Sequence, residues 1–295
     1  MVLQTIKSGT AAGYDNILPE FLKHLGPMAM MWLTAFFTRV VLEKKVPRTW
    51  RQAKVIAIPK PGKDLQLAAS YGPISLLSVC FKTLERLILH RISPVLDDLI
   101  VVEQAGFRQG RSTSDQVLAL TTFIENGFQE NLKTGTVFLD LTAAYDTVWH
   151  TGLLVKLSKS FPRWVVETVE VLLHNRRFRV HMGEKSSTWR SQVNGLPQGS
   201  VLSPCLFNVY INDLPATQSR KFAYADDVAL GAQGRTFGEV EEILNKDLEQ
   251  MAVYFRKWRL QPSVTKTVSS IFHLHNAQAS QELNIFLNGQ RLKHE

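Results

Sequence analysis

The stretch Lys221–Leu230, with the sequence KFAYADDVAL, is apolar on both sides of two adjacent acids, Asp226 and Asp227. Its pattern predicts two short strands joined by a tight turn at the acid pair. A buried carboxylate without a partner is costly, and two side by side repel each other. The neighbouring sequence offers no obvious Lys or Arg partner, so a positive group from elsewhere is expected to meet them.

A third acid, Asp140, ends a similar apolar run in VFLDLTAAYDTVWH. If the two strands are neighbours in one sheet, Asp140 and Asp226 come together, and divalent cations would resolve their repulsion. Mg²⁺ prefers such hard oxygen ligands, and two ions can clamp a phosphoryl displacement. The pair Asp226–Asp227 alone is also typical of a hairpin turn, although Val228 follows it where Gly or Asn is usual.

Composition limits the class of protein only loosely. The chain has 295 residues, is 45% hydrophobic and carries a net charge of +8, which is enough for a sizeable core and favours an anionic partner. Nucleic acid is the first expectation and a membrane surface the second, although the stretch from Met28 to Phe37 is too short to span a bilayer. Two cysteines without a zinc pattern and no signal peptide favour an intracellular protein of the cytoplasm or nucleus that is not secreted.

Periodicity predicts a mixture of helices and strands. Helices are expected over 17–43, 79–98, 112–132, 150–158, 162–175, 200–214 and 238–258. Strands are expected within 54–64, 71–77, 134–141, 176–183, 186–193, 221–232 and 267–274. Because this order lacks regular βαβ alternation, it predicts an α+β fold with an antiparallel sheet packed on helices, and it contains no convincing interdomain linker.

Several segments, in order, resemble one enzyme family. YADD at 224–227 resembles the signature of reverse transcriptases, and FLDLTAAYDTVWH resembles the strand that carries their first metal-binding Asp. Further matches are AAGYDNILPEFLKHL, VPRTWRQAKVIAIPKPGKD, QAGFRQGRSTSDQV and NGLPQGSVLSPCLFNVYINDLP. The resemblance covers almost the whole chain and points to the reverse transcriptase domain of non-LTR (LINE or Jockey-like) retrotransposons.

This resemblance implies a right-hand polymerase with fingers over about 1–133, a palm over about 134–275 and the start of a primer-grip region at 276–295, without a thumb. It implies an RNA-directed DNA polymerase that transfers nucleotides from dNTP to a DNA primer on an RNA template, with no membrane partner. The alternatives are an inactive nucleic-acid-binding relic and, more weakly, another palm-type nucleotidyltransferase such as a cyclase.

The resemblance also assigns site residues. Asp140 and Asp226 would hold two Mg²⁺ ions, with Mn²⁺ as an alternative, while Asp227 assists and the Leu141 carbonyl is a backbone ligand. Lys266 would protonate the leaving pyrophosphate, a general-acid role.

Further residues would contact nucleotide or template. The nucleotide set is Lys60, Tyr145, Gln198 and Gly199, with Tyr145 beneath the incoming sugar, and the template set is Arg108 and Arg111. A basic run is either a set of template-phosphate contacts or a solvated face, and it comprises Lys44, Lys45, Arg48, Arg51 and Lys54. Asp146 is expected to be an ordinary acid at a helix N-terminus.

The sequence departs from the family pattern at three places. Gly72 stands where the family usually has an Arg that grips the triphosphate, and Ser263 stands where Asn is common. The chain stops at LNGQRLKHE, before the primer-gripping hairpin. The missing Arg removes a charge-assisted clamp, which favours the relic alternative.

Overall fold

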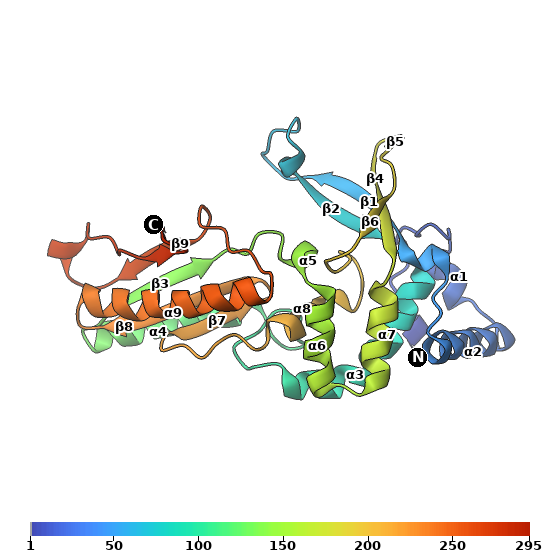
Figure 1. Ribbon diagram of the computed structural model, residues 1–295, viewed down its shortest axis with the longest axis horizontal. Helices are drawn as coiled ribbons and strands as arrows, with labels where there is room; N and C mark the ends of the chain where they lie inside the picture. The colour runs from blue at the N-terminus through green and yellow to red at the C-terminus, as the bar shows by residue number, and fades with distance from the viewer. Residues whose placement is uncertain (1) are drawn as a thin grey trace. The chain divides into compact units, whose positions relative to one another are not determined.

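The computed structural model describes residues 2–295 and divides into two compact units (Figure 1). Unit 1 comprises the chain up to Leu96 together with Trp149–Leu206, and unit 2 comprises Asp97–Val148 together with Phe207–Glu295. Two of the three crossings lie inside helices, after Leu96 and after Leu206. Because the chain passes between the units within these helices, it has no linker whose composition would reveal the division.

Unit 1 is built from helices around a small mixed sheet. Its helices are α1 (Pro19–Lys23), α2 (Pro27–Glu43), α3 (Val79–Leu99, which continues into unit 2), α6 (His150–Ser160), α7 (Arg163–Leu173) and the start of α8 (Ser203–Ile211). Its strands are β1 (Gln52–Pro59), β2 (Tyr71–Leu76), β4 (Arg176–Met182), β5 (Lys185–Ser186) and β6 (Arg190–Gln192). Short 3₁₀ turns lie at η1 (Val2–Thr5), η2 (Arg48–Arg51) and η3 (Ala68–Ser70).

The sheet of unit 1 confirms two predicted hairpins and adds a parallel pair. β1 pairs antiparallel with β2, and β4 pairs antiparallel with β5 and β6 around Gly183, whose φ is +60°. β1 also pairs parallel with β4, from Gln52 opposite Arg177 to Ile56 opposite His181. A purely antiparallel arrangement therefore fails here, because these two strands lie far apart in sequence and the intervening chain can return to the same end of the sheet.

Unit 2 has a five-stranded sheet between two helices. Its strands are β3 (Lys133–Leu139), β7 (Arg220–Tyr224), β8 (Asp227–Gly234), β9 (Val268–Phe272) and β12 (Lys293–His294), in the order β12-β9-β3-β8-β7. Its helices are α4 (Thr113–Gln129), α5 (Ala144–Thr147) and α9 (Phe237–Lys257), and the small elements η4 (Asn276–Gln278), β10 (Phe286–Leu287) and β11 (Gln290–Arg291) complete it. All neighbouring strands run antiparallel except the short β12–β9 pair, so the expected α+β class is confirmed.

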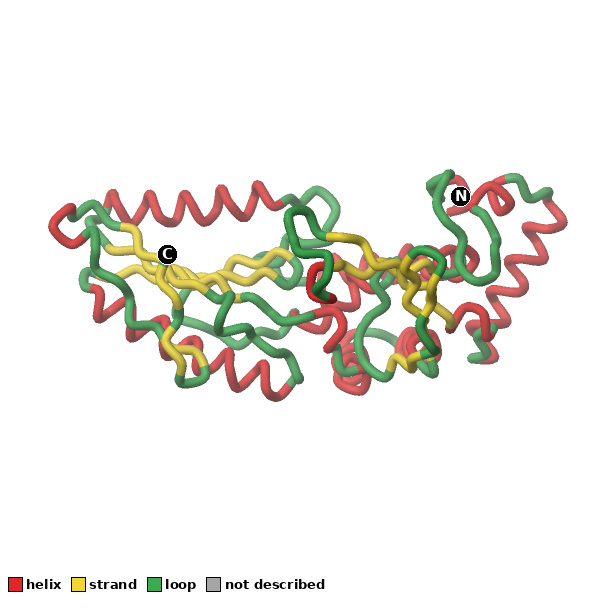
Figure 2. Tube along the Cα trace, turned by 90° about the horizontal axis from the view of Figure 1, so that it is seen from above, coloured by secondary structure: helices red, strands yellow, loops and turns green. Residues whose placement is uncertain are grey.

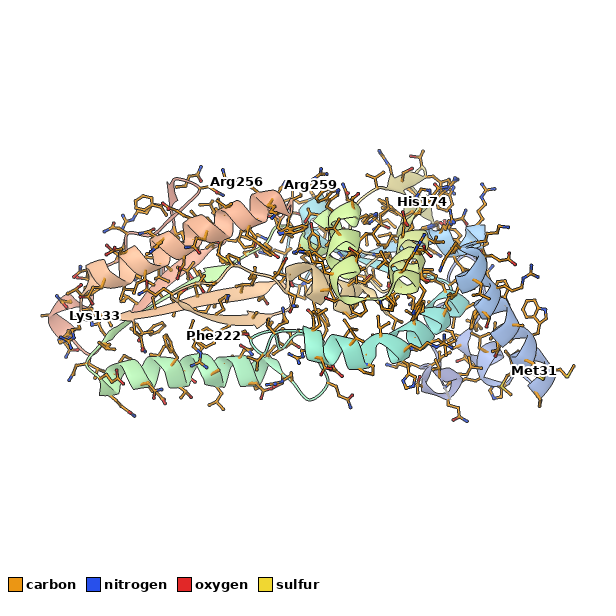
Figure 3. All side chains as sticks on the ribbon, turned by 60° about the horizontal axis from the view of Figure 1, so that its bottom comes forward. Met31, Lys133, His174, Phe222, Arg256 and Arg259 are labelled. Carbon is orange, nitrogen blue, oxygen red and sulfur yellow. The ribbon has the colours of Figure 1, made fainter. Side chains whose placement is uncertain are left out.

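The two long helices of unit 2 cover opposite faces of its sheet, as Figure 2 shows. The amphipathic stripe predicted for α9 is fully buried at Val240, Leu244, Leu248 and Met251. On the other face, Phe222 of β7 points toward α4 (Figure 3), where the ring centroid of Phe123 lies 5.9 Å away. Apolar packing therefore covers both faces of the sheet, and this packing holds its strands in place.

Local signals explain most helix boundaries. The expected helix over 17–43 is two helices, because Gly26 caps the second one and Pro27 is its first residue. α4 begins at the predicted Ser112, which forms a capping box with Asp115. α8 begins at Ser203 rather than near Ser200, since the backbone at Ser200 closes a turn onto Pro197. Within residues 2–295, no helix combines the length and apolar content that crossing a membrane requires.

Candidate active site

The turn between β7 and β8 places the acid pair at one end of the unit 2 sheet. Tyr224 pairs with Asp227, so Ala225 and Asp226 are the two central residues of a tight hairpin. Ala225 adopts a left-handed φ of +58°, where glycine is usually found. The hairpin prediction is confirmed, and the turn leaves the Asp227 side chain exposed at the edge of the sheet.

A buried glutamine holds this turn. The Gln104 side chain accepts hydrogen bonds from Ala225 N at 2.7 Å and from Gly106 N at 2.8 Å, and its Nε2 donates to Ala225 O at 2.9 Å. Beside it, Ala105 N donates to Ala223 O at 2.9 Å, so the chain at Glu103–Gly106 lies along β7 as an additional edge. The strained residue of the turn therefore has both of its backbone polar groups satisfied by a single side chain.

Asp140 reaches the same end of the sheet from β3. The last β3–β8 pair is Leu139 with Val228, so Asp140 stands one step further along, beside Asp227. The backbone around it is fixed, because Asp140 O accepts from Ser263 N at 2.8 Å and Asp140 N donates to Thr267 Oγ1 at 3.2 Å. The prediction that Asp140 and the acid pair come from neighbouring strands of one sheet therefore holds in the register.

A lysine from a remote part of the sequence lies against Asp140. Lys266 Nζ is 3.5 Å from Asp140 Oδ2, although the Lys266 side chain is 68% exposed. The expectation that a positive group from elsewhere in the chain meets the acids is therefore borne out at Asp140, because the loop before β9 brings Lys266 next to the end of β3. Asp140 Oδ2 is shielded from solvent and, apart from this ion pair, has no hydrogen-bond partner within residues 2–295, so its lone pairs are open to a ligand that displaces Lys266.

The carboxylates influence one another electrostatically. Although Asp227 is exposed overall, partial desolvation of its carboxyl raises its pKa, and the charges of Asp226 and Asp140 raise it further. Among residues 2–295, no three His, Cys, Asp or Glu side chains form a preformed metal cluster. The donor set consists of hard carboxylate oxygens and includes Asp140 Oδ2, which accepts no hydrogen bond within residues 2–295, so it fits Mg²⁺ if these side chains close around the ion.

This electrostatic strain gives a stability prediction. Because the pKa of Asp227 is raised in the folded state, its ionised form destabilises the fold above that pKa, and the cost disappears as the pH falls through it. Asp227→Asn is therefore expected to raise the unfolding temperature at about pH 7 in EDTA and to converge with the wild type near pH 4, about where aspartate ordinarily titrates. Thermal unfolding monitored by circular dichroism tests this, with the exposed Asp98→Asn as the matched control. An unchanged midpoint at every pH would contradict it.

A cavity of about 440 Å³ opens beside these carboxylates in unit 2. Its polar wall includes Asp140, Asp227 and Lys266, and its apolar wall includes Val117 of α4 and Phe138 of β3. The candidate site is therefore a concave region of unit 2 with acids on one side, and it is large enough for part of a nucleotide.

Tyr145 is packed between two aromatic rings of unit 2. Its ring stacks on Phe207 with centroids 4.7 Å apart and meets Phe107 edge-on at 6.2 Å. These contacts fix the ring in α5, so any role toward a sugar would be played by a rigid surface. Asp146 lies in the first turn of the same helix, as expected for a helix N-terminal acid.

The two predicted template arginines differ in their surroundings. Arg108 donates to three backbone carbonyls, those of Val101, Gln104 and Asp97, at 2.9 to 3.4 Å. Its guanidinium therefore braces the loop that carries Gln104. The Arg111 side chain is exposed just before α4, and template contact by either residue remains a prediction.

The predicted nucleotide loop lies in unit 1. Gly199 has a φ of +104°, and a Cβ there would lie 2.7 Å from Ser75 O, so glycine is required at this position. Gln198 O accepts from Ser75 N at 3.0 Å, which attaches the loop to β2. In the same unit, Lys60 follows β1 and its backbone N donates to Ser70 O at 2.8 Å, closing the β1–β2 loop.

Two titratable side chains, the buried Glu85 and the half-buried His150, hold that loop and were not anticipated. Glu85 of α3 accepts hydrogen bonds from Ser200 Oγ and, at 3.0 Å, from Val201 N, while burial raises its pKa. His150 Nε2 lies 2.7 Å from Gly195 O, and the ring donates through this nitrogen because a carbonyl oxygen only accepts, while burial lowers the pKa of the ring. The only signal in the sequence for these contacts is Glu85, a lone acid on the apolar face of a helix, and such an acid is weak evidence for a supporting role by itself.

Comparison with known proteins identifies the class. Residues 58–285 match the family model described as reverse transcriptase (RNA-dependent DNA polymerase). The chain therefore belongs to the reverse transcriptase family, as the motifs predicted.

The curated relatives to which the chain is similar are proteins of mobile elements. It is 34% identical over 287 residues to "Probable RNA-directed DNA polymerase from transposon BS" of Drosophila melanogaster, covering 92% of this chain and 32% of that protein. It is 30% identical to "Probable RNA-directed DNA polymerase from transposon X-element" of the same species, covering 90% and 30% of the two chains. It is 28% identical to "RNA-directed DNA polymerase from mobile element jockey" of D. melanogaster, covering 96% and 32%. The chain thus spans about a third of the length of these relatives.

Proposed function

We propose that this chain carries the polymerase site of a retrotransposon RNA-directed DNA polymerase, which extends a DNA primer on an RNA template with dNTPs. The observation that carries the proposal is the meeting of Asp140 and Asp227 at one edge of the unit 2 sheet, beside Asp226 in the hairpin. Membership of the reverse transcriptase family supports the same reaction. In this proposal unit 2 contains the palm and unit 1 contains most of the fingers.

The carboxylates would hold the catalytic metal. Asp140 and Asp226 are the proposed ligands of two Mg²⁺ ions, with Asp227 and the Leu141 carbonyl assisting. Bound Mg²⁺ supplies Lewis-acid stabilisation of the phosphates and lowers the pKa of the primer 3′-hydroxyl. The backbone bridge between Leu141 and Pro262 fixes the direction of the chain directly after Asp140.

Lys266 has two proposed tasks. Without substrate, its Nζ lies 3.5 Å from Asp140 Oδ2 and offsets part of the repulsion between the acids. Once the Asp140 carboxylate binds another group, the exposed Lys266 ammonium is able to turn toward a leaving pyrophosphate and donate a proton to it. The same side chain would therefore stabilise the empty site and act as a general acid during the reaction.

The remaining roles concern positioning. Lys60, Gln198 and Gly199 are the proposed contacts of the incoming nucleotide from unit 1, and the rigid ring of Tyr145 is the proposed barrier to a ribose 2′-hydroxyl. Arg111, with its exposed side chain, is the stronger template candidate, since Arg108 already donates to backbone carbonyls.

The test is primer extension by the purified chain on poly(rA)/oligo(dT) with Mg²⁺ and dTTP. Extension that stops when EDTA replaces Mg²⁺ is the expected result. Tight template binding with no extension under any divalent cation would refute the polymerase and favour an inactive nucleic-acid-binding relic.

Gly72 is the observation that favours the relic, and it gives a prediction. A Cβ at Gly72 would meet nothing closer than Ile58 O at 4.0 Å, so β2 has room for a side chain. Gly72→Arg is therefore expected to fold normally and to supply the triphosphate clamp that the family resemblance implies at this position. A charge-assisted hydrogen bond contributes about 1.5–3 kcal/mol, so the KM for dNTP should fall roughly tenfold or more.

Steady-state primer extension at varied dNTP concentration measures this change. Gly72→Met is the matched control, because it adds a comparable chain without the charge and should leave the KM unchanged. Equal KM values for Gly72 and Gly72→Arg would show that Lys60 or Lys63 already supplies the clamp.

A further inference from the structure

The helix α2 has two apolar stripes, and the core of unit 1 uses one of them. On that side Leu33, Phe37 and Val40 are buried. On the other side four large apolar side chains are 67% to 79% exposed, namely Met28, Met31, Trp32 and Leu42. Figure 3 shows Met31 on the outer edge of α2, away from the rest of unit 1. Exposed apolar side chains gathered on one side of a helix mark an interaction surface.

The exposed stripe has the spacing of a coiled-coil contact. Steps of three and four residues alternate along it, and its five members are all exposed: Met28, Met31, Ala35, Thr38 and Leu42. This spacing keeps them on one line of the helix, which is the pattern that packs against a second helix. We call these five residues the α2 seam.

Trp32 is held in a fixed position beside the α2 seam. Its ring stacks on Phe36 with centroids 5.4 Å apart and an interplanar angle of 4°. Phe36 in turn meets the buried Trp50 of η2 edge-on at 5.7 Å. A large exposed ring that is already fixed loses little conformational freedom when a partner covers it, and such aromatic side chains contribute strongly to protein interfaces.

The two small members of the α2 seam suit a helix rather than a lipid surface. Thr38 Oγ1 donates to Thr34 O at 2.9 Å, so a partner that buries Thr38 leaves no hydroxyl without a hydrogen bond. Ala35 lies at the middle of the seam, where its small side chain lets two helices approach closely. A helix that lies in a membrane surface buries large apolar side chains instead.

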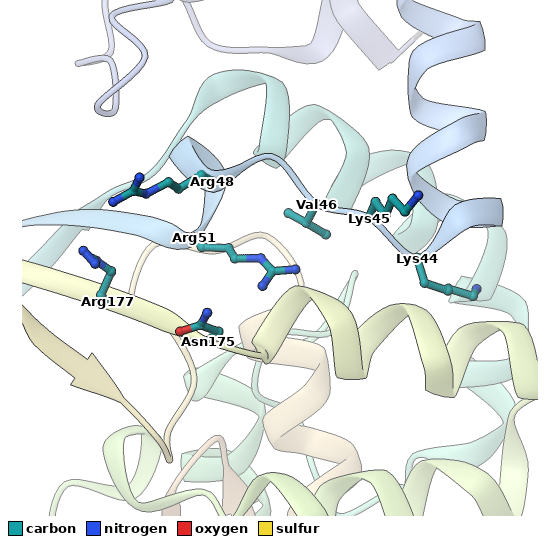
Figure 4. Close-up of a pocket in the computed structure, with 7 residues that line it drawn as sticks. All are labelled: Lys44, Lys45, Val46, Arg48, Arg51, Asn175 and Arg177. Carbon is teal, nitrogen blue, oxygen red and sulfur yellow. The ribbon is translucent and has the colours of Figure 1, made fainter.

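The charges of α2 lie at its C-terminal end. Arg39 Nη2 is 2.7 Å from Glu43 Oε1, and both side chains are exposed, so this ion pair contributes little by itself. Between Pro27 and Leu42 the helix contains no acid. After Glu43 the chain turns at Lys44, whose φ is +55°, into the basic segment drawn in Figure 4. The α2 seam is therefore an apolar surface with a charged rim at one end, an arrangement typical of protein interfaces.

The charges and the fixed ring make α2 complementary to a second copy of itself. We propose that two copies of this chain associate through an antiparallel pairing of their α2 seams. In this pairing Arg39 of one copy lies beside Trp32 of the other, where the indole face attracts a guanidinium. Glu43 lies at the start of the other copy's α2, which Gly26 leaves without a side-chain cap and whose N–H groups favour an acid. A parallel pairing would place the two helix N-termini together and would form neither contact.

The size of the contact predicts a reversible dimer. α2 has 17 residues and therefore spans about 25 Å. One pair of helices of this length covers less than the roughly 1,200 Å² at which stable interfaces begin, so we expect a dissociation constant in the micromolar range. A twofold pairing uses the same surface on both copies, so association stops at the dimer.

Sedimentation velocity of the nuclease-treated chain, at concentrations from about 1 to about 100 µM, tests the proposal. The wild type is expected to pass from monomer to dimer as its concentration rises. Ala35→Glu brings like charges together where the two helices approach closely, so it should lower the association constant roughly a hundredfold or more. Val155→Glu is the matched control, because it adds the same charge at an exposed position of α6 in the same unit, and it should dimerise like the wild type.

Oxidative cross-linking tests the antiparallel direction. Ala35 lies near the proposed twofold axis, so Ala35→Cys should form a disulfide-linked dimer under mild oxidation. Met28→Cys should stay uncoupled, because the two copies of Met28 lie at opposite ends of the helix pair. The wild type, with its buried Cys80 and half-buried Cys205, is the control for the native thiols.

Three results would overturn the proposal: a wild type that stays monomeric at the highest concentration, a dimer that Ala35→Glu leaves intact, or equal cross-linking of the two cysteine variants. Sedimentation of the chain with phosphatidylserine–phosphatidylcholine vesicles, without a dimer in solution and lost in Ala35→Glu, would assign the seam to a membrane surface instead. Circular dichroism melts should show that all variants fold. These measurements contain no primer, template, dNTP or divalent cation, so their result is separate from the proposed polymerase.

Discussion

Asp140→Asn and Asp226→Asn are each expected to lower the rate of primer extension by roughly a thousandfold or more while leaving the fold intact. Metal-held charge stabilises a phosphoryl-transfer transition state by several kcal/mol, and each step of about 1.4 kcal/mol is a factor of ten in rate. The amide of Asn keeps the size of the side chain but replaces one charged oxygen by a donor. The loss should therefore appear in kcat rather than in template affinity.

Single-turnover extension on poly(rA)/oligo(dT), with template binding measured in parallel, checks this expectation. Asp98→Asn removes an exposed acid of the same unit and should extend primers like the wild type. Removing either carboxylate should also abolish any rise in unfolding temperature that Mg²⁺ produces. Full activity in Asp140→Asn would show that the reaction occurs elsewhere in the chain.

The place of the carboxylates was predictable because each acid lies at the end of an apolar strand or in the turn beside it. Alternation and turn chemistry predicted the hairpin at Asp226 and the strand that ends at Asp140, and antiparallel pairing of β3 with β8 then brings them to one edge. The buried stripe of α9 and the capping box at Ser112 were equally local signals. Sequence patterns within one element or one hairpin therefore predicted the local structure correctly.

Contacts made between remote segments were not predictable in the same way. Lys266 neutralises part of the Asp140 charge although the two are far apart in sequence, and the parallel pairing of β1 with β4 depends on the intervening chain. From two different helices, His150 bonds Gly195 at the start of the glycine loop and Glu85 bonds Ser200 and Val201 directly after it. A single sequence gives composition and periodicity, whereas these contacts depend on which elements pack together.

Gln104 shows this limit most clearly. Its motif was visible in QAGFRQGRST, yet nothing in the motif indicates that the side chain grips Ala225, 121 residues later in the chain. It is 3% exposed, and its amide satisfies both backbone groups of the strained residue that precedes Asp226. Gly106 adds a steric condition, since a Cβ there would lie 2.2 Å from Ala225 N. The acid pair is therefore held from outside its own hairpin.

Gln104→Ala is expected to be among the most destabilising polar substitutions in unit 2. It leaves Ala225 N, Ala225 O and Gly106 N without their partner, and each unsatisfied buried group costs about 1–3 kcal/mol. Partial relaxation and entry of water reduce the sum, so we expect a loss of roughly 3 kcal/mol in the free energy of unfolding. Urea denaturation measures it, and Gln129→Ala, at an exposed position of α4, should lose less than about 0.5 kcal/mol.

A second measurement separates support of the turn from general stability. If Gln104 positions the acids, Gln104→Ala should lower kcat for primer extension at temperatures where the variant is still folded, while the KM for dNTP stays near the wild-type value. Gln104→Glu keeps the acceptor for the two N–H groups but loses the donor to Ala225 O and places a third carboxylate behind the turn. It should therefore recover part of the stability and little of the rate. Equal recovery of both would mean that Gln104 only stabilises the fold, and the geometry of Asp226 would then be set by the hairpin alone.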